Sequence, residues 1–189
     1  VPYFVVRNRG LDAVRRLRER GVRIRVLTNS LASNNVLAAH AGHAKRRKEL
    51  IAAGVELYEL RSDPPVKKTT FHLTESASVR STLHCKAFVF DRKDVFIGSL
   101  NLDPRSGDIN TEAGLYIESP ELADQMVSYM NEGVLAQTSY RVLLDAGGNL
   151  YWVCEAEGKA VRYDRDPKST SWQRTKAMLI GMLPVMDQL

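Results

Sequence analysis

The chain has 189 residues, and 44% of them are hydrophobic, which is enough for one sizeable core. Lysine and arginine outnumber aspartate and glutamate by 27 to 22, and the net charge of +5 favours an anionic partner, without choosing among nucleic acid, a phosphate ester and an anionic lipid surface. Two cysteines exclude a disulfide framework, and the longest nearly apolar run, residues 177–186, is too short to span a bilayer.

The first sixty residues alternate between strand and helix patterns. Short apolar runs predict strands at 3–7, 22–28 and 55–60. Helical spacing of apolar residues predicts a helix from Gly10 to Arg20 and a longer one, capped by Ser33 or Asn34, that ends near Ala53. This order predicts an α/β fold in which a mixed β-sheet is flanked by helices.

The rest of the chain divides into an irregular segment, a hairpin and a further run of short elements. Residues 61–83, with two prolines and many Ser and Thr residues, show no regular pattern. We interpret them either as a mobile cover over a site or as a surface loop. Apolar runs on either side of the polar tetrapeptide 91–94 predict a β-hairpin. Further strands are predicted at 110–117, 138–144, 150–154 and 161–163, with helices at 120–135 and from Ser171. We therefore expect one domain over 1–189, with 138–189 as a C-terminal extension made of a β-hairpin and an amphipathic helix.

The hairpin contains the residues that point to chemistry. His84, Lys86 and Asp91 form the pattern H-x-K-x-x-x-x-D, and Ser99 and Asn101 follow in the pattern G-S-x-N. Because side chains alternate along a strand, His84 and Lys86 should point to the same side. An ammonium there can offset the charge of phosphate oxygens, while an imidazole can attack phosphorus or move a proton. A lone histidine would fit an ordinary core hairpin, but the second pattern so close by favours phosphate chemistry.

The same alternation places Cys85 and Asp91 on the opposite side of the strand. We therefore expect Asp91 to have a structural role despite its place in the pattern, and Cys85 to be a free thiol in the core. Asn101 would add a neutral hydrogen-bond donor from the loop that follows the second strand of the hairpin.

Three other features have more than one interpretation. His40 and His43 share one side of a predicted helix, but a third metal ligand is missing, so we expect solvated helix residues. The basic run 45–48 predicts a solvated helix face or, together with the arginines of the first helix, a rim for anionic head groups. The final helix, with Trp172 and several Leu and Met residues, would lie in a bilayer interface or pack on the protein's own core.

Several segments together resemble a known family. HCKAFVFD, IGSLNLDPRS and NTEAGLYIES resemble the second catalytic motif of the phospholipase D superfamily, and the flanking segments are similar to bacterial cardiolipin synthases. The resemblance extends over nearly the whole chain. Neither His43 nor His72 completes a second H-x-K-x-x-x-x-D, so the resemblance is to a half with one motif.

The resemblance implies a phosphatidyltransferase or phosphodiesterase that acts through a phosphohistidine intermediate, with cardiolipin synthesis from anionic phospholipids as the expected reaction. It implies no metal and no cofactor. The catalytic set would be His84, Lys86, Asp91 and Glu112, with Glu112 orienting the imidazole. Lys86, Ser99 and Asn101 would bind the phosphate. Without the resemblance, Glu112 reads equally as a solvated glutamate on a strand.

The resemblance also implies partners. A missing N-terminal half or a homodimer partner would complete the active site, and the chain would touch a membrane peripherally, with nucleic acid less expected. Two alternatives remain: a one-motif phosphodiesterase or nuclease active as a homodimer, and an inactive lipid-binding fragment. Because the chain begins with Val1 inside an apolar run, we expect it to be a piece of a longer protein.

Overall fold

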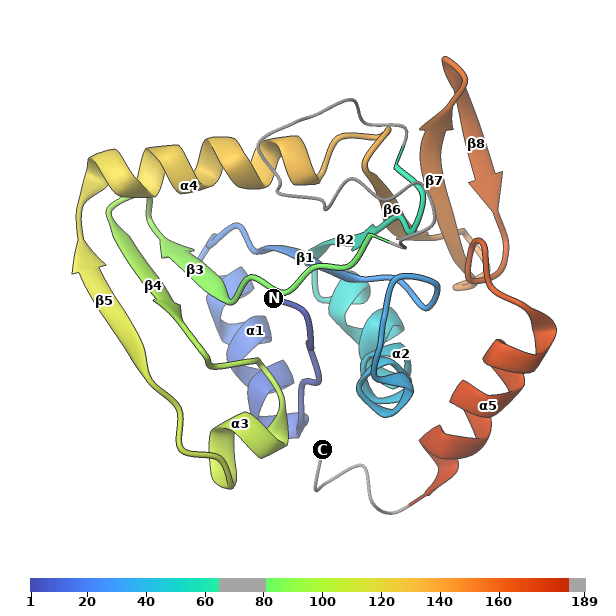
Figure 1. Cartoon of the computed structure of the whole chain (residues 1–189), viewed down its shortest axis with the longest axis horizontal. Helices are drawn as coiled ribbons and strands as arrows, with labels where there is room; N and C mark the ends of the chain where they lie inside the picture. The colour runs from blue at the N-terminus through green and yellow to red at the C-terminus, as the bar shows by residue number, and fades with distance from the viewer. Residues whose placement is uncertain (65–80, 184–189) are drawn as a thin grey trace.

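The computed structural model describes residues 1–64 and 81–183 (Figure 1). Its helices are α1 (Asn8–Glu19), α2 (Leu37–Ala52), α3 (Pro104–Asp108), α4 (Pro120–Gly133) and α5 (Ser171–Met182). Its strands are β1 (Arg25–Asn29), β2 (Glu56–Leu60), β3 (Ala87–Phe90), β4 (Asp94–Gly98), β5 (Gly114–Glu118), β6 (Ser139–Leu144), β7 (Leu150–Ala156) and β8 (Lys159–Tyr163). Most of the expected irregular segment, residues 65–80, lies outside the described ranges, so neither interpretation of it is tested.

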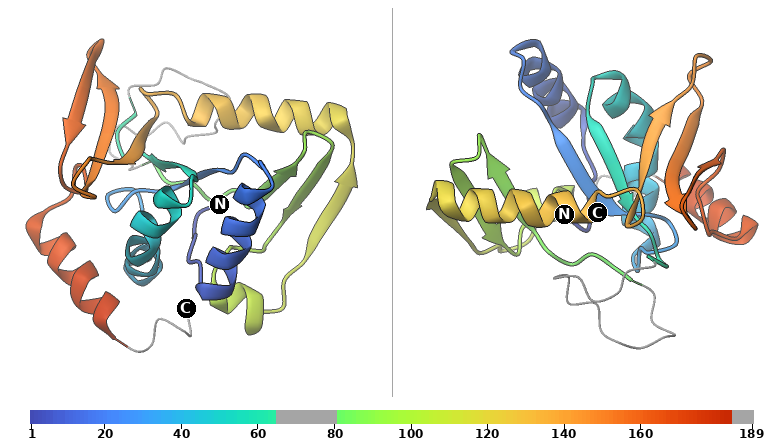
Figure 2. Two further views of the ribbon diagram at one scale, coloured as in Figure 1. Left: turned by 180° about the vertical axis from the view of Figure 1, so that it is seen from behind. Right: turned by 90° about the horizontal axis from the view of Figure 1, so that it is seen from above.

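The strands form two sheets, which Figure 2 shows beside each other with α4 running past both. The larger sheet has the order β1-β2-β6-β7-β8; β1 and β2 are parallel, and every other pair is antiparallel. The smaller sheet, β3-β4-β5, is antiparallel and contains the expected hairpin. The prediction of a mixed sheet flanked by helices is confirmed. The strands β6, β7 and β8 of the segment 138–189 continue the larger sheet beyond β2, and β6 is its middle strand.

Alternation along the strands divides the core between the two faces of the larger sheet. The face toward α2 buries a cluster made of Leu57, Tyr140, Val142, Trp152 and Cys154. The opposite face buries a second cluster, Leu27, Leu60 and Leu83, with Val134 from the end of α4 beside it. The second cluster matters for function because Leu83 directly precedes His84.

Two local expectations are wrong. The segment 3–7 forms only a single parallel bridge between Phe4 and Leu102, with the Val5 N–H donating to the Leu102 carbonyl at 2.6 Å. The helix α2 has Val36 at its N-cap position and no side-chain cap. The Ser33 hydroxyl is engaged elsewhere, because it donates to the Leu60 carbonyl at 3.0 Å and so joins the end of β1 to the end of β2.

A buried ionic cluster joins α2 to the larger sheet and to the segment after β8. The Arg47 guanidinium is 2.8 Å from Glu59 on β2 and 2.9 Å from Asp166, and it lies over the Trp152 ring at 5.3 Å. Glu59 also accepts a hydrogen bond from the Trp152 indole at 2.9 Å. Arg47 and Glu59 are at most 2% exposed. Isolated charges would not be stable at such burial, so each depends on its partners.

The same cluster overturns two sequence-based expectations about α2. His40 and His43 are buried rather than solvated: His43 Nε2 is 3.1 Å from Glu59, and His40 Nε2 accepts from Arg47 at 2.7 Å. Arg47, expected on a solvated face, is buried as well, although Lys45 and Lys48 of the same run are exposed. The spacing of 40, 43 and 47 is that of one helical stripe, and this stripe faces the sheet.

Arg47→Met should lower the free energy of unfolding by about 3–5 kcal/mol, because it leaves the buried Glu59 and Asp166 carboxylates without their main cation. Urea unfolding followed by circular dichroism measures this. Lys48→Met is the matched control, since Lys48 is exposed on the same helix and should change stability by no more than about 0.5 kcal/mol. Equal effects of the two variants would contradict the importance of the cluster.

Acid should destabilise the protein, and His40 should account for the part of this loss that begins near pH 6.5. Burial, helped by Arg47, lowers the pKa of His40 below its ordinary 6.5. The unfolded chain therefore takes up this proton first, and stability falls by up to about 1.4 kcal/mol per pH unit below pH 6.5. Burial alone would raise the pKa values of Glu59 and Asp166, but Arg47 outweighs it and lowers both, so their contribution is lost only below about pH 4.5.

Urea unfolding at intervals from pH 7.5 to 4 measures both parts of this dependence. In His40→Gln the slope between pH 6.5 and 5 should become flatter, while the loss at lower pH remains. An unchanged slope in that interval would show that His40 does not titrate as described.

Candidate active site

His84 and Lys86 lie in contact just before β3. Lys86 Nζ is 3.3 Å from His84 Nε2 and donates to the His84 carbonyl at 3.0 Å. The two side chains are therefore on the same side, as strand alternation predicts. His84 is exposed and Lys86 is half-buried, so a ligand can reach the imidazole while the ammonium stays beside it.

The environment of Lys86 favours binding of an anion. Burial lowers the pKa of the Lys86 ammonium, and nearby acidic groups that include Glu112 and Asp103 oppose this shift. The Gly98 N–H donates to the Lys86 carbonyl at 3.2 Å, which fixes the backbone of Lys86 against the end of β4. A partly desolvated ammonium on a fixed backbone interacts more strongly with a phosphate than a fully hydrated one does.

The strands β4 and β5 come very close together next to Ser99. A Cβ placed on Gly98 would lie 2.3 Å from the Ala113 carbonyl oxygen, so only glycine allows this approach. Immediately afterwards the Ser99 N–H donates to the Ala113 carbonyl at 2.8 Å, and the Ala113 N–H donates to the Ser99 hydroxyl at 3.0 Å. The glycine of the G-S-x-N pattern thus holds Ser99 against the strand that follows Glu112.

Glu112 is engaged with Ser99 and Asn110. The Ser99 hydroxyl donates to one carboxylate oxygen, and Asn110 Nδ2 donates to the other at 3.2 Å. These hydrogen bonds, with that of Ser99 first, lower the pKa of Glu112, so the side chain is a carboxylate. Among the described contacts, none joins Glu112 to the His84 ring. The expected role of Glu112 in orienting the imidazole therefore stays a prediction.

Asn101 follows in a loop that α3 supports. Asp103 caps α3 by accepting from the Ser106 N–H at 2.7 Å, and the Ser106 hydroxyl accepts from the Asn101 N–H at 3.3 Å. The Asn101 side-chain oxygen is buried and has no hydrogen-bond partner within residues 1–64 and 81–183. This oxygen is a hydrogen-bond acceptor, so it does not test the expected donation from Asn101 to a phosphate, which stays a prediction.

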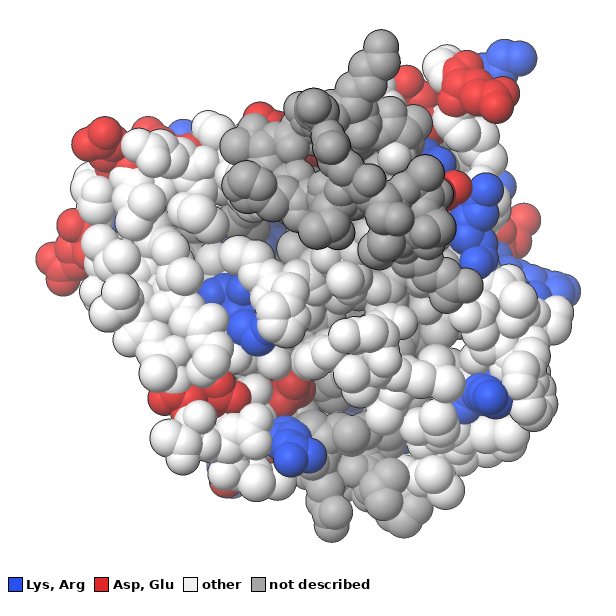
Figure 3. Space-filling model, in the orientation of Figure 1, with Lys and Arg blue, Asp and Glu red and all other residues white. Residues whose placement is uncertain are grey.

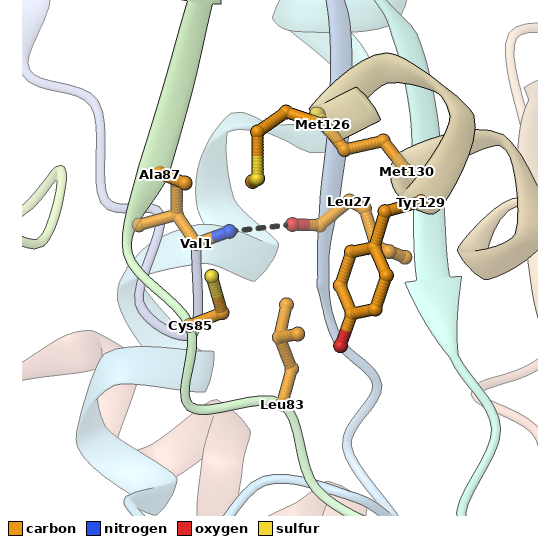
Figure 4. Close-up of a pocket in the computed structure, with 8 residues that line it drawn as sticks. All are labelled: Val1, Leu27, Leu83, Cys85, Ala87, Met126, Tyr129 and Met130. Atoms are coloured by element: carbon orange, nitrogen blue, oxygen red, sulfur yellow. Dashed lines mark hydrogen bonds between the residues drawn. The ribbon is translucent and has the colours of Figure 1, made fainter. Parts of the chain in front are cut away.

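Asp91 lies in the turn of the hairpin, whereas Cys85 lies beside a small apolar cavity near the start of β3. Asp91 lies in the hairpin turn at a φ of 50°, and seven residues of extended chain place it about 20 Å from His84. Cys85 is exposed, so the expectation of a core thiol is wrong. It does share a side with Ala87, and both line a small apolar cavity of about 30 Å³ whose far wall comes from α4 (Figure 4). Both Cys85 and Cys154 are free thiols.

The sequence reasoning missed Asn29, which positions the active-site strand. Its side chain accepts from the Leu83 N–H at 2.8 Å and donates to the Leu83 carbonyl at 3.0 Å. Asn29 is 1% exposed at the end of β1. This amide pair fixes the backbone of the residue before His84. The available signal was a polar residue directly after a buried strand.

Within the described ranges no helix combines the length and apolar character needed to cross a membrane. The same residues contain no group of His, Cys, Asp and Glu side chains arranged to hold a metal ion. The expectation of a reaction without metal is a matter for experiment and stays a prediction.

Comparisons with known proteins agree with this architecture. The solved structure of Nuc from Salmonella typhimurium, a phospholipase D family member, matches 74% of the chain at 17% identity, covers 78% of Nuc and gives a TM-score of 0.53. Phosphatidylserine synthase of Haemophilus influenzae matches 74% of the chain at 18% identity, covering 32% of that structure, also with a TM-score of 0.53. These likenesses define the fold as that of the phospholipase D class.

The sequence comparison identifies the family more narrowly. Residues 1–133 match the family model described as "Cardiolipin synthase, PLD-like domain", so the chain belongs to this family. Cardiolipin synthase C of Escherichia coli (strain K12) is 38% identical over 183 residues, which are 97% of this chain and 38% of that protein. The chain spans between 33% and 38% of the length of the curated relatives it matches.

Asn29→Ala should reduce both stability and activity. Removing the carboxamide leaves the buried N–H and carbonyl of Leu83 without partners, which costs about 1–3 kcal/mol. The strand start at His84 should then gain freedom, visible as faster hydrogen exchange of the Leu83 amide. Asn35→Ala is the control, because Asn35 is exposed and bonds only to the Tyr3 hydroxyl. Unchanged exchange at Leu83 would contradict the positioning role.

Proposed function

We propose that this chain is one catalytic half of a phosphatidyltransferase that forms cardiolipin from anionic phospholipids. The observation that supports the proposal most directly is the contact between Lys86 and the exposed His84 in a chain of the cardiolipin synthase family. Lys86, Ser99 and Asn101 bind the phosphate, Glu112 orients His84, and Asp91 supports the hairpin turn.

The reaction divides into two steps with two histidines. A histidine of the missing half attacks phosphorus; its N–P bond forms as the P–O bond to the leaving alcohol breaks, and His84 gives a proton to that alcohol. His84 then takes a proton from the acceptor alcohol, whose oxygen attacks phosphorus while the N–P bond breaks. The phosphoryl oxygens stay beside the Lys86 ammonium throughout, which stabilises the charge of each transition state.

The histidines that the structure describes do not supply a second accessible imidazole. His72 lies outside the described residues, and among those described His40 and His43 are at most 2% exposed in the ionic cluster on α2. Only His84 is accessible among the described histidines. A single imidazole cannot be covalently bound to phosphorus and protonate the leaving group at the same time, so the second must come from another half or another copy.

The surface supports a lipid substrate over nucleic acid. The side of the molecule that includes β3, β4 and β5 is largely uncharged (Figure 3), and these strands expose Phe90 and Tyr116 on one face of the sheet and Ile97 and Leu115 on the other. A nucleic acid would need basic side chains spaced along its phosphates. An apolar surface beside the His84–Lys86 pair fits acyl chains or a second protein surface better.

The 189-residue chain, verified as a monomer, should have essentially no activity, and addition of the complementary half should restore it. In the assembled enzyme, vesicles of phosphatidylglycerol should yield cardiolipin, measured by mass spectrometry. His84→Ala and Lys86→Ala should each reduce the rate by about 10²-fold or more without loss of folding. Lys93→Ala, at an exposed position in the hairpin turn, is the control and should be neutral.

Two results would overturn this proposal. Turnover by a verified monomer would remove the need for a second imidazole. Efficient cleavage of single-stranded DNA with no lipid product would favour a nuclease instead, active as a homodimer if pairing of two His84 side chains restores the rate.

A further inference from the structure

Helix α5 packs with its small residues inward. It flanks α2 on the side away from α1 (Figure 1), and its buried residues are Ala177 and Gly181. A Cβ on Gly181 would lie 3.5 Å from Lys45 Cε and 3.9 Å from the Ala41 side chain, which shows how closely α5 approaches α2. The helix is therefore held by its backbone and small side chains, not by its large apolar ones.

The large apolar side chains of α5 point outward. Five of them, each between 50% and 70% exposed, extend along the helix and its end: Trp172, Met178, Leu179, Met182 and Leu183. At 100° per residue they fall on one arc opposite Ala177 and Gly181 that also contains Ser171 and Thr175, and Lys176 lies at the edge of this arc. This is the reverse of an ordinary surface helix, whose apolar arc faces the core. We call these five residues the outer arc.

The charges around the outer arc identify the chemistry that would cover it. α5 contains no acidic residue, and Lys176 places its ammonium 4.9 Å from the centroid of the Trp172 ring. Lys45 and Lys48 on the neighbouring α2 are exposed, and within the described part of the chain no carboxylate lies within 4 Å of either ammonium. An apolar surface with a lysine at its edge and a tryptophan at one end, on a helix without acidic residues, matches the interface of an anionic bilayer.

We propose that α5 is the membrane-docking helix of this protein: its outer arc enters the interface of an anionic phospholipid bilayer while Lys176, at the edge of the arc, contacts the head groups. The inference rests on the proposed function in that the substrate is drawn from such a bilayer. A protein partner is a poorer match, because the outer arc offers little hydrogen-bonding capacity and no charge of the opposite sign for directional contacts.

Intrinsic fluorescence provides the test, because the two tryptophans differ in exposure. Trp152 is buried, whereas Trp172 is 62% exposed. Vesicles of phosphatidylglycerol should shift the emission to shorter wavelength, and lipids brominated in their acyl chains should quench it. Vesicles of phosphatidylcholine should bind far more weakly. The measurement is made on the 189-residue chain and on the assembled enzyme, and the control Trp172→Tyr should abolish the shift.

Matched variants separate the outer arc from general hydrophobicity and charge. Leu179→Glu and Met182→Glu should each weaken binding to phosphatidylglycerol vesicles by about tenfold or more. Leu135→Glu, at an equally exposed leucine beyond the end of α4, should not. Lys176→Glu should weaken binding by about fivefold or more, and Lys159→Glu on β8 should have little effect.

Three outcomes would overturn the docking role of α5. The α5 variants and their controls could bind vesicles with equal affinity, or Trp172 could be protected from acrylamide in the assembled enzyme without lipid. In the third outcome, Leu179→Glu converts a dimer to a monomer without changing vesicle affinity.

A separate comparison distinguishes docking from catalysis. His84→Ala should bind vesicles like the wild type. If the α5 variants lose binding but no cardiolipin forms in any assembly, docking stands and the proposed chemistry fails. If cardiolipin forms while α5 variants bind and react normally, the chemistry stands and the docking role fails.

Discussion

The buried ion pair between Arg47 and Glu59 helps to position both helix α5 and the strand that begins after His84. It joins α2 to β2 inside the protein, where neither charge has water as an alternative partner. Through Asp166 it also holds the segment that leads from β8 into α5. On its other side, β2 pairs in parallel with β1, whose last residue is Asn29. The position of α5 and the position of the active-site strand thus depend on the same buried charges.

Asn29 transmits this order to the active site through two hydrogen bonds to Leu83. His84, the proposed acid and base, has few contacts of its own, since it is exposed and touches chiefly Lys86. A catalytic imidazole has to be accessible, so its orientation comes from backbone that is fixed elsewhere. The same division appears at Gly98, where the closest approach of two strands fixes the backbone beside Ser99. Backbone that other residues hold in place therefore precedes both His84 and Ser99 along the chain.

The sequence predicted those features that depend on local periodicity. Alternation along a strand placed His84 and Lys86 together, and short apolar runs located the hairpin and the final helix correctly. Sequence periodicity does not reveal a polar residue's partner when that partner is distant in sequence. Arg47, His40 and His43 therefore look like solvated helix residues, although Glu59 and Asp166 pair with them inside the protein. Their spacing of three and four residues places them on one side of the helix. Because they are polar, the sequence predicts that this side faces solvent, whereas it faces the sheet. The predicted N-cap role of Ser33 fails for the same reason, because its hydroxyl donates to the Leu60 carbonyl of β2 instead of capping α2.

The helices α2 and α5 both depart from the usual pattern of apolar residues inside and polar residues outside: α2 buries polar residues, and α5 exposes large apolar ones. On α2 a charged arginine and two histidines face the core, and carboxylates from β2 and from the segment after β8 compensate them inside the protein. On α5 the small residues are inside, and large apolar side chains meet water with nothing in the described chain to cover them. Buried charges that are paired inside the protein serve its stability. Apolar side chains that remain exposed to water indicate a surface that contacts another molecule. The same reasoning applies to the His84–Lys86 pair: within the described residues the Lys86 ammonium forms no ion pair, although Glu112 and Asp103 lie close enough to raise its pKa. In the function proposed here, one external partner serves both features, because a membrane of anionic phospholipid offers a phosphate to the His84–Lys86 pair and an apolar interface to the outer arc.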